Sequence, residues 1–470
     1  MALSARQDQN PQQGPSSSSA PPGQGGAEGP GSAGPDRAPR GLMPLLMLGN
    51  TAMFTLYVGV GGVLLPLQIE QIDKADKVAM LGLVSGVSAV FATLFNPVAG
   101  ALSDRSGRRN PWILGGGLAA VGAMGLLGGV GTVLLVTIAW CLGQAVMNVY
   151  QAAITSVVPD RVPLSARGRA SAAVGLGMPV GSILGALLGS AFADRIATGY
   201  LVLGAFVALS AVLFTSLARE KPLPEAAGAG PVPLYAQAAA ADTEPAPPPN
   251  EQATAADTKP APPLNKQFAA FLGALRHHDF RWAFIGRALL VLGYFCVFGY
   301  QLYILQDHVD LPSGIEPQDA VAILTPVNAV AMAASTIVGG VLSDRLDRRK
   351  LFVALSAVIS AVALLVPAIS PTWPAMLVFA VLNGLGFGCF MAVDNALVSM
   401  ILPSAEDAAR DLGVLNMAQA GPQILAPFAA SVIVLLCGGG QGGGYTALFV
   451  AGAVLSVLGA LAVRPIRGVR

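Results

Sequence analysis

The feature that most constrains this chain is a succession of long apolar runs that are nearly free of charged residues. Of the 470 residues, 54% are hydrophobic and 11% are charged, whereas a soluble globular protein carries roughly 25% charged residues. Each run is about 20 residues long, which is enough for a helix to cross the hydrocarbon core of a bilayer. A helix also satisfies its own backbone hydrogen bonds in lipid. The sequence therefore predicts an all-α polytopic membrane protein.

The apolar runs form two groups of six, which predicts 12 transmembrane helices. The first group comprises 44–68, 78–102, 111–131, a run that ends near 158, 170–192 and 199–217. The second group lies near 281–305, 320–342, 351–370, 373–399, 411–437 and 444–463. We expect each group to fold into a six-helix bundle, at 41–218 and at 276–464.

Two polar stretches flank the first bundle. Residues 1–40 consist mainly of Gln, Pro, Ser, Gly and Ala, and residues 219–275 are rich in Ala, Pro and Glu. Segments with so few large apolar residues bury too little surface to offset the entropy lost on ordering. We therefore predict a disordered N-terminal tail and a disordered central linker, with residues 465–470 as a short C-terminal tail.

Arginine and lysine are distributed unevenly between the two sides of the predicted membrane domain. The loops on one side hold Arg105, Arg108, Arg109, Arg161, Arg167, Arg169, Arg345, Arg348, Arg349, Lys350, Arg464, Arg467 and Arg470. The loops on the opposite side hold only Lys74, Lys77 and Arg195. Because short loops rich in Arg and Lys stay in the cytoplasm, both termini and the linker are expected on the cytoplasmic side of the plasma membrane.

A short charged loop separates the second and third runs, with the sequence GALSDRSGRR at 100–109. A related sequence, GVLSDRLDRR, occupies 340–349 at the corresponding place in the second half. Two parallel repeats of six spans predict bundles related by an axis along the membrane normal, with a binding site between them at mid-depth. The pattern indicates a carrier that moves one half against the other.

GALSDRSGRR matches the loop signature G-x-x-x-D-R-x-G-R-R of the major facilitator superfamily at every fixed position, whereas the second copy has Asp347 in place of the glycine. The chain resembles this superfamily over nearly the whole membrane domain, which implies its pseudo-two-fold fold and transport by alternating access. SDRSGRRNPWIL, LGVLNMAQAGPQ at 412–423 and YQLYILQDH at 300–308 are similar to sucrose and glycoside–pentoside–hexuronide transporters. This finer resemblance implies a sugar or glycoside as the substrate.

The superfamily resemblance also implies a gate on the cytoplasmic side. Asp104 is expected to dock at the start of the eleventh helix, near Asp411, where unpaired N–H groups and the helix dipole favour a negative charge. Asp344 is expected to repeat this arrangement near Arg167 and Arg169 of the fifth helix. The alternative is that these charges only set the topology. The candidate gate residues are Gly100, Asp104, Arg105, Gly107, Arg108, Arg109, Asp344, Arg345, Arg348 and Arg349.

Asp394 lies inside the tenth apolar run, several residues from its cytoplasmic end. An ionised carboxylate at that depth is costly unless it is paired or faces water, so a functional role is the default expectation. Arg287, about two turns into the seventh run, is the predicted partner. The pair is either the coupling site, at which Asp394 accepts a proton, or a static ion pair that holds helices together.

Polar and aromatic side chains recur at helical spacing within several runs. In the fourth run, Gln144, Asn148 and Gln151 lie on one face of the helix. Amides that face lipid would be unsatisfied, so these faces are expected to point inward, either as cavity lining or as contacts between helices. Amides and aromatic rings suit a ligand with many hydroxyl groups. The candidate cavity residues are Asn50, Tyr57, Gln144, Asn148, Gln151, Tyr294, Gln301, Asn383, Asn416, Gln419 and Gln423.

Two functions are compatible with these patterns. The first is a proton-coupled transporter that imports a sugar or glycoside, and the alternative is proton-driven efflux of a drug or secondary metabolite. The composition excludes a soluble enzyme, and we expect no enzymatic activity, no cofactor and no metal site. The expected partners are a small-molecule substrate, protons and the lipid bilayer, without nucleic acid, and the chain is expected to be a monomer.

Overall fold

A computed structural model describes residues 41–106, 108–163, 166–219, 275–346, 348–400, 408–440 and 443–466. All of them belong to one compact unit, Ala38–Arg470. This part of the chain contains 12 helical spans long and apolar enough to cross a membrane, and it forms no β-strand. The predicted all-α polytopic fold is therefore confirmed. The predicted tail at 1–40, nearly all of the linker and the last residues, 467–470, lie outside the described residues.

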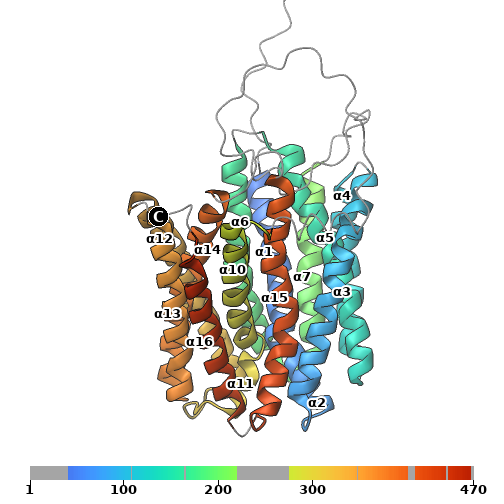
Figure 1. Ribbon diagram of the computed structural model, residues 1–470. Helices are drawn as coiled ribbons and strands as arrows, with labels where there is room; N and C mark the ends of the chain where they lie inside the picture. Colours follow the sequence, from blue (N-terminus) through green and yellow to red (C-terminus); the bar gives the residue numbers. More distant parts are fainter. Residues whose placement is uncertain are drawn as a thin grey trace, which may run out of the picture. The chain divides into compact units, whose positions relative to one another are not determined.

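The helices follow the predicted plan of two groups (Figure 1). The first half contains α1 (Leu42–Gly59), α2 (Leu65–Ile72), α3 (Lys77–Arg105), α4 (Asn110–Gly129), α5 (Val133–Arg161), α6 (Arg167–Ala191) and α7 (Ile196–Leu217). The second half contains α10 (His278–Phe298), α11 (Gln301–Asp307), α12 (Pro317–Leu346), α13 (Arg349–Ile369), α14 (Trp373–Met400), α15 (Ala408–Leu436) and α16 (Gly444–Val463).

A π-helical turn, Val60–Leu64, joins α1 to α2, so that the first span continues from Leu42 to Ile72. Turns of this kind inside α-helices occur frequently at functional sites. Gly61 and Gly62 lie in this turn, and a Cβ atom placed on Gly61 would have no atom within 4 Å. Packing against another helix therefore does not require a glycine at position 61.

The seventh span is shorter than predicted. The sequence predicted one helix near 281–305, whereas α10 ends at Phe298 and the separate helix α11 starts at Gln301. Between them, Tyr300 leaves the helical conformation, with φ −110° and ψ 10°. Its hydroxyl lies 3.1 Å from the carbonyl oxygens of Val78 and Pro427 and shares its single proton between them. These contacts anchor the break, and hydropathy cannot register them because the whole stretch is apolar.

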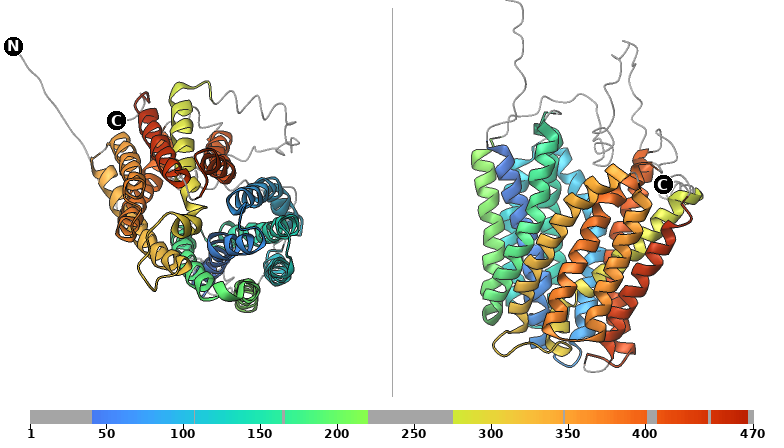
Figure 2. Two further views of the ribbon diagram at one scale, coloured as in Figure 1. Left: turned by 90° about the horizontal axis from the view of Figure 1, so that it is seen from below. Right: turned by 90° about the vertical axis from the view of Figure 1, so that its left-hand side faces the viewer.

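The two halves repeat the same set of helix neighbours. In the first half, α3 packs on α5, α1 on α6, and α4 on α7; in the second half, α12 packs on α14, α10 on α15, and α13 on α16. The halves meet through α3 with α15 and through α6 with α12. Figure 2 (left) shows the two groups side by side, one coloured blue to green and the other yellow to red. This arrangement is the pseudo-two-fold repeat that the two charged loops predicted.

The two ends of the helix bundle differ in the segments that they carry. The linker end is the end at which Leu217 and Leu275 flank the linker, and the far end is the opposite end, which carries α2 and α11 (Figure 1). At the far end, hydrogen bonds join the halves, including one from Ser190 of α6 to Asp319 of α12. Toward the linker end, Gly100 of α3 and Gly421 of α15 have open space where a Cβ atom would stand. The structure is closed at the far end.

Glycines allow α1 and α6 to pack at backbone distance. Gly177, Gly181 and Gly185 follow one another every four residues and are buried on one face of α6. A Cβ atom on Gly181 would lie 2.5 Å from the carbonyl oxygen of Thr51, and one on Gly185 would lie 2.5 Å from that of Thr55. Because these neighbours are backbone atoms, they cannot move aside cheaply. Small residues at such crossings let membrane helices approach closely.

We predict that Gly181→Ala destabilises the first half by about 1–3 kcal/mol, as other overpacked substitutions do. Gly175→Ala on the same helix is the matched control, because Gly175 is exposed and has no atom within 4 Å of its Cβ position. Thermal unfolding of the purified variants in detergent measures the difference. Equal unfolding midpoints for the two variants would contradict the packing argument.

Candidate functional site

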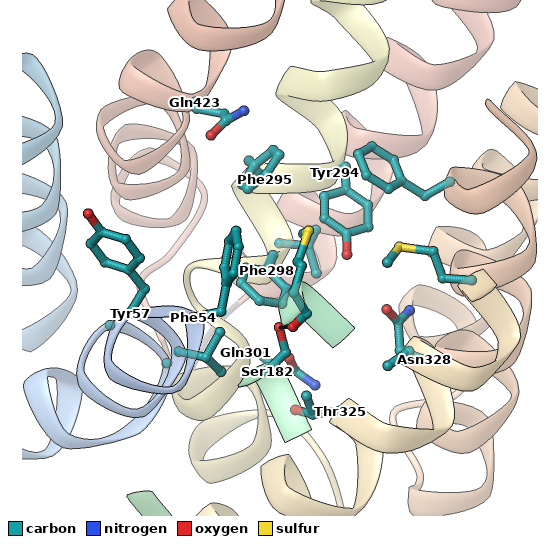
Figure 3. A pocket seen from close by; sticks show the side chains of 18 of the residues that line it. Phe54, Tyr57, Ser182, Tyr294, Phe295, Phe298, Gln301, Thr325, Asn328 and Gln423 are labelled. Atoms are coloured by element: carbon teal, nitrogen blue, oxygen red, sulfur yellow. Dashed lines mark hydrogen bonds between the residues drawn. The ribbon is translucent and has the colours of Figure 1, made fainter. Parts of the chain in front are cut away.

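A cavity of about 710 Å³ lies between the two halves. In the first half, its walls come from α1, the π-helical turn that follows it, α2, α3, α5 and α6. In the second half, they come from α10, α11, α12, α14 and α15. Figure 3 shows side chains from both halves pointing into it, among them Phe54 of α1, Phe298 of α10 and Asn328 of α12. The volume is in the range of pockets that enclose a small organic molecule.

None of the described residues that line the cavity is charged. The lining combines aromatic rings with side-chain amides. The eight aromatic residues are Phe54, Tyr57, Trp140, Tyr294, Phe295, Phe298, Phe379 and Phe387. The six amides are Gln144, Gln301, Asn328, Asn383, Gln419 and Gln423. Serine and threonine hydroxyls and the glycines Gly61 and Gly62 complete the polar and backbone surface.

Most of the aromatic surface belongs to the second half. The ring of Tyr294 stacks on Phe387 of α14, with centroids 3.9 Å apart and planes 18° apart. The same ring lies nearly parallel to Phe298 at 5.9 Å, while Phe295 meets it edge-on at 5.2 Å. These rings form a rigid apolar wall. Aromatic side chains offer a large contact area, and the tyrosine adds a polar group.

Seven of the eleven candidate cavity residues line this cavity: Tyr57, Gln144, Tyr294, Gln301, Asn383, Gln419 and Gln423. They come from six different helices, so the structure brings together side chains that are up to about 370 residues apart in sequence.

The other four candidates do not line it. Asn50 is buried in the contact between α1 and α6 and donates a hydrogen bond to the carbonyl oxygen of Leu46 at 2.9 Å. Asn148 donates to the carbonyl oxygen of Gln144 within α5 at 2.9 Å. Gln151 lies farther along α5, and Asn416 is exposed on α15. Two of these amides therefore donate to backbone carbonyls of their own helices, a use of the side chain that helical spacing alone does not distinguish from cavity lining.

The sequence interpretation missed several lining residues. Phe387 follows Asn383 by one helical turn, and Asn328 follows Thr325 on α12 at a spacing of three. Extending the polar stripes by one turn to include aromatic residues would have found Phe387. Trp140, one turn before Gln144, would have been found in the same way.

Arg287 and Asp394 form a buried ion pair, as their sequence positions predicted. Their side chains are 8% and 6% exposed, and two guanidinium nitrogens, Nε and Nη2, contact the same carboxylate oxygen. Neither residue lines the cavity, but Met391, three residues before Asp394 on α14, does. Arg287 precedes Tyr294 of the aromatic wall by seven residues on α10. On both α10 and α14, the pair therefore lies closer to the linker end than the aromatic wall does.

The charged loop after α3 binds within its own half. Arg109 donates from Nε to Asp160 at the end of α5 at 2.8 Å and from Nη1 to the hydroxyl of Ser103 at 2.7 Å. The sequence interpretation did not single out Asp160. Arg109, one of the candidate gate residues, therefore braces α3 against α5 through these two contacts.

The other gate candidates are distributed along the linker end. Arg108, Arg345 and Arg348 are exposed, Gly100 lies within α3, and Arg349 begins α13. Gly107 lies outside the described residues, as do the side chains of Asp104, Arg105 and Asp344. The predicted docking of Asp104 at α15 therefore stays a prediction.

Comparisons with known proteins agree with this architecture. The Major Facilitator Superfamily matches residues 46–316 and 314–469. The multi-drug resistance efflux pump PmrA of Streptococcus pneumoniae, in two strains, is 31% identical over 157 residues, which cover 30% of this chain and 38% of the pump. The chain thus spans well under half of the length of these curated relatives.

Solved structures share the fold at low sequence identity. A point mutant of the nucleoside transporter NupG matches with a TM-score of 0.70 and 16% identity, over 90% of this chain and 99% of its own. A bacterial homolog of the human lysosomal transporter Spinster, in an inward-facing and occupied conformation, matches with a TM-score of 0.69 and 14% identity, over 90% and 95% of the two chains. With both halves matched, this chain belongs to the Major Facilitator Superfamily, and its 12 apolar helical spans are those of a multi-pass membrane protein.

Proposed function

We propose that this transporter carries an uncharged solute with a ring and several hydroxyl groups, most specifically a sugar or glycoside, in symport with protons. The observation that carries the proposal is the cavity lining, which combines eight aromatic rings and six amides without a charged side chain among the described residues. The finer resemblance of LGVLNMAQAGPQ to sugar transporters supports the same substrate class.

The chemistry of the lining favours such a ligand. Each amide both donates and accepts hydrogen bonds, so it can pair with a hydroxyl group in either direction. The apolar face of a sugar ring fits against an aromatic ring such as Phe387. An ion entering this cavity would lose its hydration without gaining an opposite charge, which is costly. The cavity therefore selects against charged solutes.

The Arg287–Asp394 pair supplies the proposed coupling site. It joins α10 to α14, and the aromatic wall of the cavity stands on these same two helices. Protonation of Asp394 would remove the charge that holds the guanidinium, and it would loosen the connection between the two helices. The Arg287–Asp394 contact would then link proton binding to the shape of the aromatic wall.

The proposed orientation places the linker end in the cytoplasm and the protein in the plasma membrane as a monomer. The argument is the concentration of loop arginines at that end, which the positive-inside rule associates with the cytoplasm. The protein acts as a carrier and not as an enzyme in this proposal.

Efflux of a drug or secondary metabolite is the second candidate. The observation that favours it is the partial match to a protein named as a multi-drug resistance efflux pump. The cavity also contains Met178, Met332 and Met391, whose flexible thioethers adapt to ligands of different shape. A charge-free lining restricts this alternative to uncharged compounds.

Transport in liposomes that contain an internal pH dye tests the proposal. We expect that adding a transported sugar or glycoside acidifies the interior, because the solute gradient drives proton entry, and that Asp394→Asn abolishes the acidification. Asp194→Asn, which alters an exposed carboxylate outside the cavity, is the matched control and should behave like the unaltered protein. Sugar entry without acidification would reject proton coupling, and a response to drugs alone would favour efflux.

Stability measurements separate the coupling role from a structural role of the ion pair. Arg287→Met leaves Asp394 buried without its partner, and we expect a loss of about 3–5 kcal/mol of folding stability. The double variant Arg287→Met/Asp394→Leu should recover most of this loss but should not recover acidification. A double variant that transports protons as well as the unaltered protein would show that the pair is only structural.

A further inference from the structure

Helix α11 belongs to the second half but binds the first half. Tyr303 donates a hydrogen bond from its buried hydroxyl to the carbonyl oxygen of Pro66 at 2.8 Å. Tyr300, just before the helix, donates to the carbonyl oxygen of Val78 at 3.1 Å. Both α2 and α11 lie at the far end of the bundle (Figure 1). This seven-residue helix therefore closes the far end against the first half.

Lys77, at the start of α3, is the charged centre of this contact. Its ammonium group lies 3.0 Å from Oε1 of Glu70, 2.9 Å from Oδ1 of Asp307 and 3.1 Å from Oε1 of Gln306. An ammonium group has three protons to donate, so these three acceptors use them all. The Lys77 nitrogen also lies 4.7 Å from the ring centroid of Tyr303. At this distance the electron-rich face of the ring attracts the positive charge in a cation–π interaction. The lysine side chain is 10% exposed.

The charges are distributed unequally between the halves. Glu70 and Lys77 stand on either side of the short loop between α2 and α3, so they remain together whatever the second half does. Asp307 belongs to the second half, and when Lys77 is withdrawn, the contact that it keeps among the described residues is the hydroxyl of Tyr445, at 3.1 Å. Burial lowers the pKa of the adjacent His308, which disfavours the charged form of this ring in the closed contact. Separation of the halves at the far end therefore leaves one carboxylate without its cation.

We propose that Lys77 and Asp307 form an ionic gate that sets the balance between the closed and open states of the far end. The contact is made when the halves close there and must break before the cavity can open to that side. Tyr300 and Tyr303 position α11 for this contact, while the ion pair supplies the part of the closing energy that depends on charge. The gate acts on the conformation of the protein alone, independently of which solute is carried.

Distance measurement between two spin labels tests the gate without any substrate. The labels are placed on Gly131→Cys in the loop between α4 and α5 and on Ser313→Cys in the loop between α11 and α12, after replacement of the four natural cysteines. Both positions are exposed at the far end. In the reference protein we expect a predominantly short distance. Lys77→Met should raise the ratio of open to closed molecules on the order of tenfold, as expected for loss of one charge-assisted contact.

Three further variants make the test decisive. Asp307→Asn removes the charge but keeps the side-chain shape, so it should also shift the distances toward the open state. This variant tests the gate on its own if Lys77→Met is too unstable to measure. Lys77→Arg keeps the charge and should stay close to the reference. Lys74→Met is the matched control, because Lys74 is exposed and makes no ion pair in the part of the chain that the structure describes.

Unchanged distances in folded Asp307→Asn would overturn the gate, and so would a shift of equal size in Lys74→Met. Loss of solute transport is not a criterion here, so a failure of the substrate proposal and a failure of the gate give different results. A thermal unfolding midpoint measured for each variant shows whether it is folded.

Discussion

In a bilayer, the two halves of a carrier gain little by burying apolar side chains against each other, because the surrounding lipid is equally apolar. Their association must rest on close packing and on polar contacts. Within the first half, close packing holds helices together where α6 crosses α1 at backbone distance. Between the halves, the tyrosine hydroxyls on and before α11 and the shared ammonium of Lys77 supply polar contacts at the far end. The cavity lies between helices that are held together at that end.

The two halves are alike in helix arrangement but not in chemistry. The same neighbours recur around α3 and α12, yet the stacked aromatic wall and the buried ion pair both belong to α10 and α14 of the second half. The first half contributes glycine-rich packing and the amide of Gln144. The repeated scaffold thus carries an asymmetric interior, with the aromatic wall and the buried ion pair both in the second half.

Most of the fold followed from hydropathy, because a lipid environment leaves a hydrophobic chain few alternatives to helices. The Arg287–Asp394 pair was also predictable, since two opposite charges inside apolar runs are too costly to remain apart. The amides were harder to place. Asn148 and Gln144 lie on the same face of α5, but the first bonds to a backbone carbonyl and the second lines the cavity. The spacing of residues along a helix predicts which side chains share a face. Whether that face lines a cavity or contacts another helix depends on the packing of the neighbouring helices, which the spacing does not give.

The far-end contacts could not be predicted for a related reason. Lys77 is one of the few lysines on its side of the membrane, and the sequence interpretation used it only to count loop charges. Its partners Gln306 and Asp307 are about 230 residues away in the chain. The break at Tyr300, which positions them, depends on a carbonyl oxygen in the other half. Contacts of this kind arise from the packing of the two halves and leave no periodic pattern.

The π-helical turn at Val60–Leu64 has a consequence for the range of solutes that such a carrier accepts. Gly61 borders the cavity and touches no other side chain at the place where its own would stand. A methyl group added there would occupy solute space and leave the contacts between helices intact. The size limit of the cavity can therefore change by one small substitution without a cost in folding. At Gly181 and Gly185 an added methyl group would meet the backbone of α1, whereas at Gly61 it would meet only the cavity.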